Sequence, residues 1–359
     1  MCQMCISISE EERKEAFAER LVEMMNSAAL TMMISVGHRS GLLDTMAELP
    51  PSTSEEIAEA AYLNERYVRE WLNALVVGRI VEYDSEEKTY HLPKEHAAWM
   101  TRAATPNNLA VFTQYTGLFG TVEDQVLECF RRGGGVRYEE FGRFQEIMAE
   151  DSGQTVVPEL IDSILPLVPG LIDRLKQGID VLDLGCGRGW AMNLLAKTFP
   201  RSRFIGYDFS EEAIIMANRR AVRNGSSNVR FEVVDASRVN ANAAFDLVCT
   251  FDAIHDQAKP QTVLNNIYRA LRPGGVYLMQ DIHSSRDVEK NMENPIAPLL
   301  YSISTFHCMT VSLALGGAGL GTMWGEETAL EMLSEAGFES IERHRLPHDI
   351  QNTFFITRK

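Results

Sequence analysis

The spacing of hydrophobic positions changes about halfway along the chain. In the first hundred residues apolar side chains recur at helical intervals, as they do in the run Val68, Trp71, Leu72, Leu75 and Val76. From residue 179 onward, short apolar runs alternate with helical segments, which is typical of a parallel sheet with crossover helices. The sequence therefore predicts a mainly helical N-terminal domain followed by an α/β domain.

The N-terminal pattern predicts three helices and a hairpin. A long apolar helix is expected over residues 24–43, and Thr53 and Glu56 form a capping box that opens a short second helix. Asn64 is expected to cap the third helix. Two short strands, 80–83 and 89–92, flank the turn 84–88. Three helices and a hairpin make a winged helix, with residues 64–79 in the position of a recognition helix.

The charge of this region argues against DNA binding. Residues 50–96 hold ten acidic and five basic residues, a net charge of −5, and the wing tip reads Asp-Ser-Glu-Glu-Lys. A DNA-binding face needs basic residues, because phosphate contacts supply most of its affinity. We therefore expect a dimerisation domain over residues 1–100, with the apolar helix as the seam of a homodimer.

The second half carries a turn suited to a nucleotide cofactor. The apolar strand that starts at Ile179 runs through Asp183 into Gly185, Gly187 and Gly189, and a helix follows from Trp190. Glycines at this spacing let the backbone turn tightly and approach a ligand. The Gly-x-Gly-x-Gly spacing differs from the Gly-x-Gly-x-x-Gly of dinucleotide folds, and Asp183 would repel a pyrophosphate but could accept from an amino group.

Further strands end in polar residues at the same predicted edge. The expected strands are 203–207, 229–234, 245–250 and 276–280, and the first three are followed by Asp208, by Asp235 and Ala236, and by Phe251 and Asp252. Residues 271–275 form a glycine turn into the strand 276–280. Ligands of open α/β sheets bind at the carboxyl ends of the strands. An acidic residue about 20 positions after the glycine turn is placed to reach ribose hydroxyls, which suits Asp208.

These motifs resemble, in order, those of class I S-adenosylmethionine-dependent methyltransferases. The matching stretches are Val181-Leu-Asp-Leu-Gly-Cys-Gly-Arg-Gly, Gly206-Tyr-Asp-Phe-Ser, Val234-Asp-Ala, Phe245-Asp-Leu-Val and Leu271-Arg-Pro-Gly-Gly. The resemblance covers roughly residues 150–359 and implies a Rossmann-like seven-stranded sheet with an antiparallel last strand, formed by the stretches 337–342 and 352–357. It implies S-adenosylmethionine as the cofactor, with Asp183 and the glycine loop at the methionine part, Asp208 at the ribose, and Asp235, Phe209 and Ala236 at the adenine. Phe251 and Asp252 complete the expected cofactor site.

His255 is the candidate general base. It follows the fourth strand, at the ligand edge of the sheet, and a histidine with a pKa near neutrality can take the proton of an acceptor hydroxyl. His255 and Asp256 resemble the His-Asp pair of small-molecule O-methyltransferases, which also carry a winged-helix dimerisation domain. Their supporting carboxylate corresponds to Asp281. Whether His255 is oriented by Asp281 or only binds the substrate is left open by the sequence.

The acceptor side is expected to involve two further segments. Residues 294–325 contain no Lys, Arg, Asp or Glu, but their prolines, glycines and polar residues rule out a continuous membrane span. They are expected to form a buried helix and turn that line an apolar pocket for the methyl acceptor, with Tyr301, Phe306, His307, Met309 and Trp324 as candidates. Residues 101–160 form a helical linker, in which Tyr138 and Phe144 are candidates for a lid over the cofactor.

Composition agrees with this division. The 359 residues suggest two domains, and we assign the catalytic one to 161–359. The net charge of −16 disfavours nucleic acids and anionic membranes as partners. Scattered cysteines suit a reducing cytosol, and Cys2 and Cys5 alone do not make a zinc site. No catalytic metal is expected, since only Asp252 of a catechol-type Asp/Asp/Asn set is in place. Alternatives are an S- or N-methyltransferase and a ligand-binding transcriptional regulator.

Overall fold

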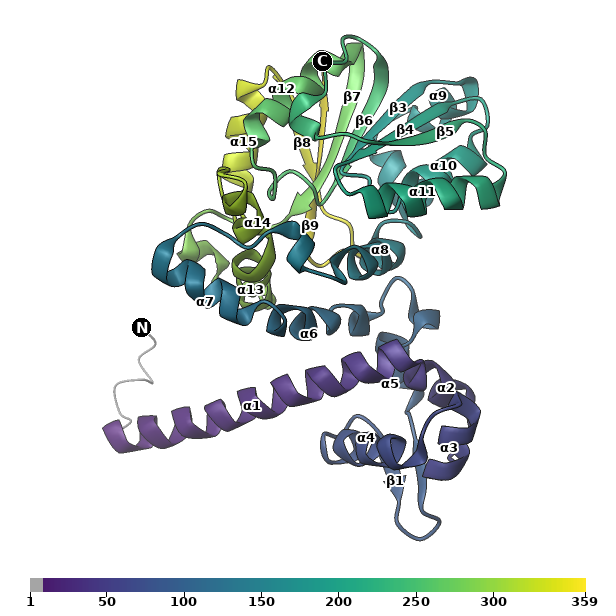
Figure 1. The fold of residues 1–359 in the computed structure, drawn as a ribbon, viewed down its shortest axis with the longest axis vertical. Helices are drawn as coiled ribbons and strands as arrows, with labels where there is room; N and C mark the ends of the chain where they lie inside the picture. Colours follow the sequence, from purple (N-terminus) through teal and green to yellow (C-terminus); the bar gives the residue numbers. More distant parts are fainter. Residues whose placement is uncertain (1–8) are drawn as a thin grey trace. The chain divides into compact units, whose positions relative to one another are not determined.

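The computed structural model describes residues 9–359 and divides into two compact units after Gly117 (Figure 1). Cys2 and Cys5 lie outside the described residues. The expected linker, 101–160, thus falls partly in each unit. Each unit is built around a hydrophobic core of its own.

The first unit has the helices and hairpin of a winged helix. Its elements are α1 (Glu10–Ser40), α2 (Leu42–Glu48), α3 (Ser54–Ala61), α4 (Glu65–Val77), β1 (Glu82–Asp84), β2 (Thr89–His91) and α5 (Lys94–Met100). The Thr53 and Glu56 capping box is present as predicted. Asn64 takes the N-cap position of α4, although its side chain makes no capping hydrogen bond.

The long first helix differs from the expectation at both ends. It begins at Glu10, because Ser9 and Glu12 form a second capping box and three glutamates in the first turn complement the helix dipole. It ends at Ser40, because Gly41 takes a left-handed conformation with φ 79°, and α2 starts after it. The helix is therefore much longer than its apolar stretch.

A buried tryptophan ties α1 to α4. Trp71 donates its indole N–H to the carbonyl of Met33 at 2.8 Å. Gly37 faces the same ring, and a Cβ built there would lie 2.4 Å from it. The helices can therefore approach closely only because residue 37 has no side chain.

The second unit contains a seven-stranded sheet in the order β5-β4-β3-β6-β7-β9-β8. The strands are β3 (Asp180–Leu184), β4 (Arg203–Asp208), β5 (Val229–Val233), β6 (Phe245–Phe251), β7 (Leu271–Ile282), β8 (Ile341–His344) and β9 (Asn352–Arg358). Neighbouring strands from β5 to β7 are parallel, and β9 is antiparallel to both β7 and β8. The predicted fold class is confirmed.

One turn was predicted wrongly. Residues 271–275 belong to β7, which begins at Leu271 rather than at Val276. The pairing with β6 shifts between Phe245 and Leu247, and Gly274 has φ 75°. Leu271 pairs with Phe245 and Val276 pairs with Leu247, so residues 272–275 form an irregularity inside β7 rather than a turn before it.

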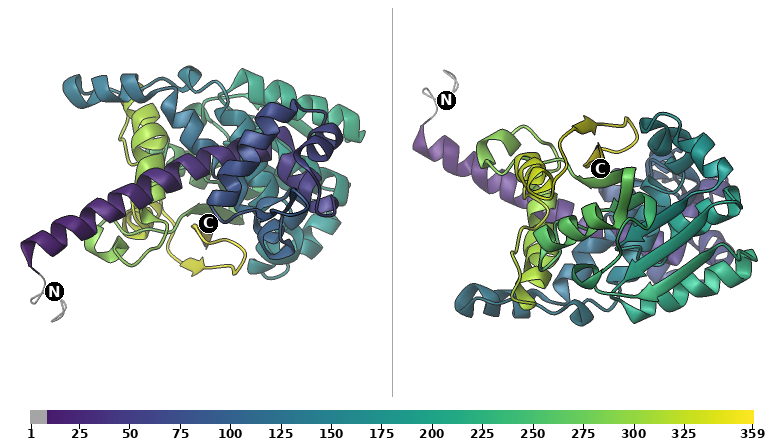
Figure 2. Two further views of the ribbon diagram at one scale, coloured as in Figure 1. Left: turned by 90° about the horizontal axis from the view of Figure 1, so that it is seen from below. Right: turned by 90° about the horizontal axis from the view of Figure 1, so that it is seen from above.

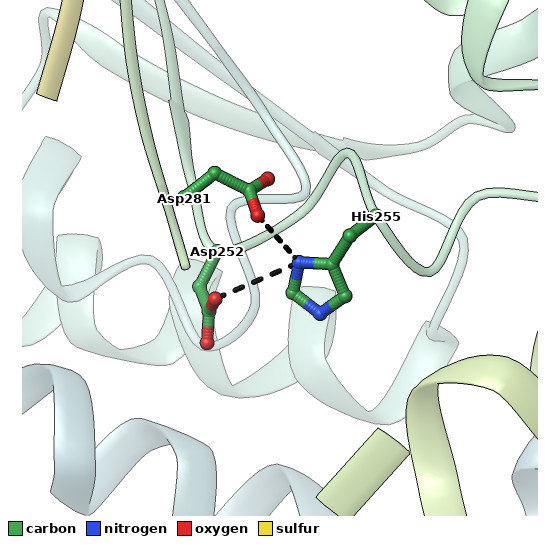
Figure 3. A group of neighbouring side chains, drawn as sticks. All are labelled: Asp252, His255 and Asp281. Carbon is green, nitrogen blue, oxygen red and sulfur yellow. Dashed lines mark hydrogen bonds and ion pairs between the residues drawn. The ribbon is translucent and has the colours of Figure 1, made fainter. Parts of the chain in front are cut away.

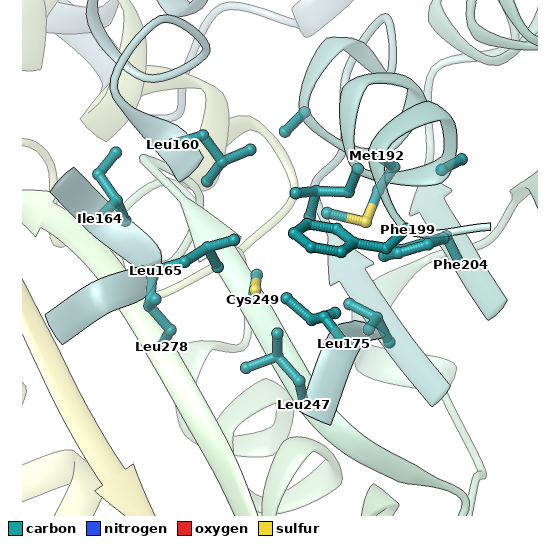
Figure 4. Packing of buried hydrophobic residues seen from close by; sticks show 14 of the residues in the cluster. Leu160, Ile164, Leu165, Leu175, Met192, Phe199, Phe204, Leu247, Cys249 and Leu278 are labelled. Atoms are coloured by element: carbon teal, nitrogen blue, oxygen red, sulfur yellow. The ribbon is translucent and has the colours of Figure 1, made fainter. Parts of the chain in front are cut away.

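Helices cover both faces of the sheet (Figure 1 and Figure 2). One face packs against α9 (Leu171–Gln177), α10 (Trp190–Thr198) and α11 (Glu211–Asn224), and the other against α12 (Pro260–Ala270) and α15 (Glu326–Glu335). Side chains alternate between them: Leu247 and Cys249 belong to the first core, shown in Figure 4, and Val248 to the second. This burial on both faces explains the nearly continuous apolar runs.

The remaining helices lie before the sheet and between its last strands. They are α6 (Gln114–Gly120), α7 (Glu123–Arg132), α8 (Phe144–Thr155), α13 (Ala297–Ile303) and α14 (Met309–Ala314), with a π-helical turn over Ser304–Cys308. The uncharged stretch 294–325 was expected to form one buried helix and a turn; it instead folds into two short helices around a π-helical turn, followed by a loop, and Tyr301 and Leu315 are exposed. In the described part of the chain, no helix is both long and apolar enough to cross a membrane.

Candidate active site

The glycine loop after β3 is shaped by its neighbours. Gly185, Gly187 and Gly189 have φ values of 78°, 49° and 68°, which favour glycine. A Cβ on Gly185 would lie 2.6 Å from the Cβ of Ala253, and one on Gly189 would lie 2.6 Å from the ring of Phe231. At Gly187 the nearest atom, of Gln145, is 3.6 Å away. Packing therefore requires the outer two glycines, whereas the middle one leaves room beside the backbone.

Asp208 at the end of β4 holds this loop. One carboxylate oxygen accepts from the amide of Gly187 and the other from the amide of Ser210, both at 2.9 Å. Each oxygen has two acceptor directions, so these bonds leave capacity for a ligand hydroxyl. The residue predicted to bind ribose thus also fixes the loop.

Asp183 is a buried carboxyl group with an unmet acceptor. Its Oδ1 has no hydrogen-bond partner among the described residues. Burial, with a further contribution from Asp208, raises the pKa of Asp183 to about 8. A buried carboxylate without a partner is costly, and an ammonium group placed beside it would stabilise the ionised form. The site therefore fits the amino-acid part of the expected cofactor.

The residues predicted at the adenine (Asp235, Phe209 and Ala236), and Phe251 of the expected cofactor site, follow or end parallel strands of the sheet. Asp235 follows β5 and accepts from the amide of Ser237 at 2.8 Å, and Ala236 begins a short 3₁₀ turn. Phe209, after β4, has an exposed ring. Phe251 is the last residue of β6 and is partly buried. Their placement at one edge follows from the parallel strands, and their role in cofactor binding stays a prediction.

His255 and Asp281 form a buried dyad (Figure 3). The Nδ1 of His255 donates to Oδ1 of Asp281 at 2.8 Å, and the two side chains are 2% and 0% exposed. Asp252 is farther away, with its Oδ1 3.8 Å from Nδ1 of His255. Asp252 follows β6 and Asp281 lies near the end of β7, so adjacent parallel strands bring the two carboxyls together. This hydrogen bond is the contact expected if Asp281 orients His255, and whether His255 acts as a base or only binds the substrate stays a prediction.

The backbone at Asp252 is strained. Its φ of 55° lies in the left-handed region, which non-glycine residues rarely adopt. Its amide donates to the carbonyl of Gln280 at 3.0 Å, which fixes this conformation against β7. Strain of this kind concentrates at functional sites.

Trp324 contacts the dyad. Its indole N–H donates to Oδ1 of Asp281 at 3.0 Å and the side chain is buried, and its expected role in lining the acceptor pocket stays a prediction. The amide of Ile282 donates to the same oxygen at 2.9 Å. Asp281 Oδ1 therefore accepts three hydrogen bonds, which fix its orientation.

Electrostatics set the protonation of these groups. Burial lowers the pKa of His255, but Asp281 and Cys308 together raise it by more, and the pKa lies well above its usual value. Burial raises the pKa of Asp252 to about 6 and that of Asp256 to about 7, although His255 lowers both. His307 behaves oppositely, since burial, with His255 nearby, holds its pKa well below the usual range.

An aromatic cluster joins the two sides of the site. The ring of His307 stacks on Phe144 with centroids 3.5 Å apart. Tyr138 meets Phe144 and Phe209 edge-on, with centroids 5.4 and 4.7 Å apart. Tyr138 and Phe144 of the linker thus contact each other and His307 of the stretch 294–325. Phe209, which Tyr138 meets, links this group to the cofactor side. Phe306 stacks elsewhere, on Phe119.

Gln145 was missed by the sequence analysis. Its amide nitrogen donates to the hydroxyl of Tyr138 at 2.5 Å, and its oxygen is the nearest atom to the space beside Gly187. It therefore connects the proposed lid to the glycine loop. Only its position next to Phe144 could have suggested it.

Tyr301 has a contact outside this group. Its hydroxyl accepts from Asn291 at 3.2 Å, and the side chain is partly exposed. The contacts of the described residues do not join it to the dyad.

Together with Asp252, the dyad offers side chains of the kinds that bind metal ions. Potential ligand atoms of Asp252, His255 and Asp281 lie within 4.8 Å of one another. In the structure Nδ1 of His255 is engaged by Asp281, and Oδ1 of Asp281 by Trp324. The expectation that the chemistry needs no metal stays a prediction.

Comparison with known families fits both units. Residues 28–102 match a family model described as an Rv2258c-like winged HTH domain, and residues 175–337 match one described as a methyltransferase domain. The chain joins a winged helix-turn-helix domain to a methyltransferase domain. The methyl donor of such a domain is S-adenosylmethionine, and the glycine loop, Asp183 and Asp208 suit it.

Relatives of the methyltransferase domain differ in their acceptors. The chain is 27% identical over 175 residues to malonyl-[acyl-carrier protein] O-methyltransferase of Bacillus cereus, covering 45% of this chain and 58% of that protein. It is 32% identical over 154 residues to phosphoethanolamine N-methyltransferase 1 of Triticum aestivum, covering 42% of this chain and 28% of that protein. The chain thus spans less than two thirds of either relative.

The fold of the whole chain has counterparts among solved structures. The structure of human N-acetylserotonin methyltransferase in complex with S-adenosylmethionine aligns with a TM-score of 0.70, over 100% of this chain and 99% of that one. The sequence identity is 17%, so the likeness concerns the fold.

Proposed function

We propose that this protein transfers the methyl group of S-adenosylmethionine to an oxygen of a small molecule, with His255 as the general base. The 2.8 Å hydrogen bond from Nδ1 of His255 to Asp281 carries the proposal. With Nδ1 donating, Nε2 is the nitrogen that can accept a proton. Ala253, two residues earlier, packs against Gly185, so the dyad lies beside the cofactor loop.

Three residues have separate roles in the proposed reaction. The cofactor supplies a methyl group already activated on a sulfonium. His255 takes the proton of the acceptor hydroxyl at Nε2, and Asp281 stabilises the imidazolium that forms. Trp324 holds Asp281 in place. Burial of the dyad limits water near the developing charges and strengthens these interactions.

An acceptor nitrogen or sulfur is the alternative. The two relatives above are named for O- and N-methylation, so resemblance does not choose between them. A deeply buried histidine bonded to a carboxylate favours an acceptor that must lose a proton, because a thioether needs no base.

The experiment is an acceptor screen with purified protein. Phenols, hydroxy acids, amines, thiols and thioethers are incubated with S-adenosylmethionine, and release of S-adenosylhomocysteine is followed. We expect turnover with a hydroxyl acceptor and an O-methyl product by mass spectrometry. Turnover confined to thioethers would contradict the role of His255, and failure to bind the cofactor in calorimetry would contradict the function itself.

For the N-terminal domain we propose homodimerisation rather than DNA binding. The residues of α1 include large exposed apolar side chains, namely Phe17, Leu21, Val22, Met24, Met25, Met32 and Val36. On α4, Arg66 and Arg69 are paired with Glu70 and Glu65. These pairs leave little positive charge for phosphate contacts, which weighs against the transcriptional regulator. Light scattering at micromolar concentration should give the dimer mass, and a monomer would contradict the proposal.

A cytoplasmic location is also proposed. The described cysteines are Cys129, Cys186, Cys249 and Cys308, and all four are free, which supports a reducing compartment.

A further inference from the structure

The carboxyl group of Asp252 has no hydrogen-bond partner. Its Oδ1 is buried and accepts no hydrogen bond from residues 9–359. Its ion-pair contact in this range is with His255, where Oδ1 lies 3.8 Å from Nδ1. That distance is too long for a hydrogen bond, and Nδ1 already donates to Asp281 at 2.8 Å. A buried acceptor without a donor is rare in native proteins and calls for an explanation.

The backbone holds this carboxyl in a strained position. Asp252 has a φ of 55°, and its amide donates to the carbonyl of Gln280 at 3.0 Å. The side-chain amide of Gln280 donates in turn to Asp349 at 3.0 Å, so the residue that fixes Asp252 is itself fixed. A glycine would take this conformation without strain, yet the sequence places an aspartate there. Strain that the surroundings impose at one carboxyl points to a use for that carboxyl.

A ligand beside the base can reach this group. The Asp252 side chain is 23% exposed, whereas that of Asp281 is fully buried. Ala253, the next residue, packs against Gly185 of the cofactor loop. Figure 3 shows the Asp252 carboxyl beside the imidazole ring of His255, and Nε2 of that ring is joined to neither carboxyl. Asp252 therefore offers a free acceptor next to both the dyad and the cofactor loop.

Two neighbouring oxygens of one ligand can meet both groups. Under the proposed function, the methylated hydroxyl donates to Nε2 of His255. The Asp252 carboxyl lies 3.8 Å from the other nitrogen of the same ring, so one ring width separates the two contacts further. Two hydrogen bonds of about 2.8 Å, made by oxygens on adjacent carbon atoms, bridge a span of this size. A carboxyl oxygen accepts such a bond whether the group is ionised or protonated.

We propose that Asp252 selects methyl acceptors that carry a second, neutral hydrogen-bond donor next to the methylated oxygen, as the second hydroxyl of a vicinal diol does. This inference rests on the proposed function, because it assigns the acceptor of the same site. The second donor gives the carboxyl the partner that it lacks and holds the first hydroxyl at Nε2 of His255. Asp252 was expected in the cofactor site, and the proposal assigns its side chain to the acceptor instead.

The test uses three phenols that differ in one hydroxyl. Catechol has two neighbouring hydroxyls, resorcinol has two separated ones, and phenol has one. Each is titrated by calorimetry into the full-length protein saturated with S-adenosylhomocysteine. We expect catechol to bind at least about tenfold more tightly than the other two, which is the usual effect of a hydrogen bond to a charged group. Equal affinities, or no binding of catechol at millimolar concentration, would overturn the proposal.

Two variants assign the preference to Asp252. Asp252→Gly removes the acceptor and keeps the backbone conformation, so the ratio of catechol to resorcinol affinity should fall close to one. Asp252→Asn keeps an acceptor oxygen and should retain part of the preference. The matched control is Ala243→Gly, which relieves a φ of 46° before the opposite end of β6 and should keep the wild-type ratio. A wild-type ratio in Asp252→Gly would overturn the proposal. An equal loss of S-adenosylhomocysteine affinity would also overturn it, because Asp252 would then serve the cofactor.

Further measurements separate this inference from its alternatives. The titrations are repeated with a chelator, and a catechol preference that disappears with it would assign the preference to a bound metal and overturn the proposal. Methylation of phenol with the same rate and affinity as catechol would refute this inference and leave the proposed function standing. A catechol preference without turnover of any acceptor would refute the proposed function and leave the role of Asp252 in ligand selection standing.

Discussion

The proposed cofactor side and the proposed acceptor side of the candidate active site are built in different ways. The cofactor side consists mainly of backbone: three glycines with positive φ and Asp208, whose bonds go to main-chain amides. The acceptor side consists of side chains, because His255, Asp281 and Trp324 come from three separate segments and meet at one carboxylate oxygen. Changes on the cofactor side should therefore alter binding through shape, and changes on the acceptor side should alter rate and pH dependence through charge.

The strongest test of this difference removes the base. His255→Ala should lower kcat by about 10² to 10⁴, since proton transfer loses its acceptor, while cofactor affinity stays within a few-fold. Steady-state kinetics and calorimetry measure the two quantities. His344→Ala, on β8 at the edge of the sheet, is the matched control and should keep normal turnover. Wild-type kcat in His255→Ala would leave alignment of the substrates as the source of catalysis.

The second test concerns pH. Only neutral His255 accepts a proton, so kcat/KM should fall as pH drops through its pKa, which lies above the usual value because of Asp281. Asp281→Asn removes that carboxylate, so the acid limb should move to lower pH and kcat should fall roughly tenfold or more. A pH profile with an unmoved acid limb would mean that Asp281 has only a structural role.

The third test applies to the cofactor side. Gly187→Val places a branched side chain at a φ of 49° and fills the space between the loop and Gln145. S-adenosylmethionine should therefore bind at least about tenfold more weakly. Asp208→Ala should have a similar effect, because it frees the amide of Gly187. Gly120→Val, where a Cβ meets no atom within 4 Å, is the control for calorimetry. Normal affinity in both loop variants would contradict the assignment of the cofactor site.

A smaller effect is expected at the positioning tryptophan. Trp324→Phe removes one of three hydrogen bonds to Asp281 Oδ1 and keeps most of the packing, so kcat should fall by about two- to tenfold. The position of the acid limb should shift slightly, whereas KM for the cofactor should not change. Trp99→Phe, at an exposed site on α5, should have no effect on either. A change confined to the KM for the cofactor would mean that Trp324 supports cofactor binding rather than the dyad.

The smallest effect is expected from metal removal. Dialysis against a chelator should leave turnover within about twofold, because His255 and Asp281 are engaged with each other and the sulfonium needs no Lewis acid. Loss of activity that returns with a divalent cation would show that Asp252, His255 and Asp281 hold a metal.

The same difference explains what the sequence could predict. The glycine loop and the strand ends are local patterns, so Asp183, Asp208 and the glycines were found where the structure places them at one edge. Asp281 was found only through resemblance to a family. The hydrogen bond from Trp324, the position of Gln145 and the strain at Asp252 depend on contacts between distant segments or on backbone conformation, and the sequence carries no periodic signal for them. The start of α1 was missed for another reason: its first turns are polar and only their capping box marks them.

The hydrogen bond between Trp324 and Asp281 has an optical consequence. Indole fluorescence responds to the charge and hydrogen bonding around its N–H group, and here that group faces the carboxylate that pairs with His255. Ionisation of the dyad, or arrival of a ligand beside it, should therefore change the emission of this residue. The chain has four tryptophans, so the part of the emission that is lost in Trp324→Phe should report on ligands beside the proposed base without a label.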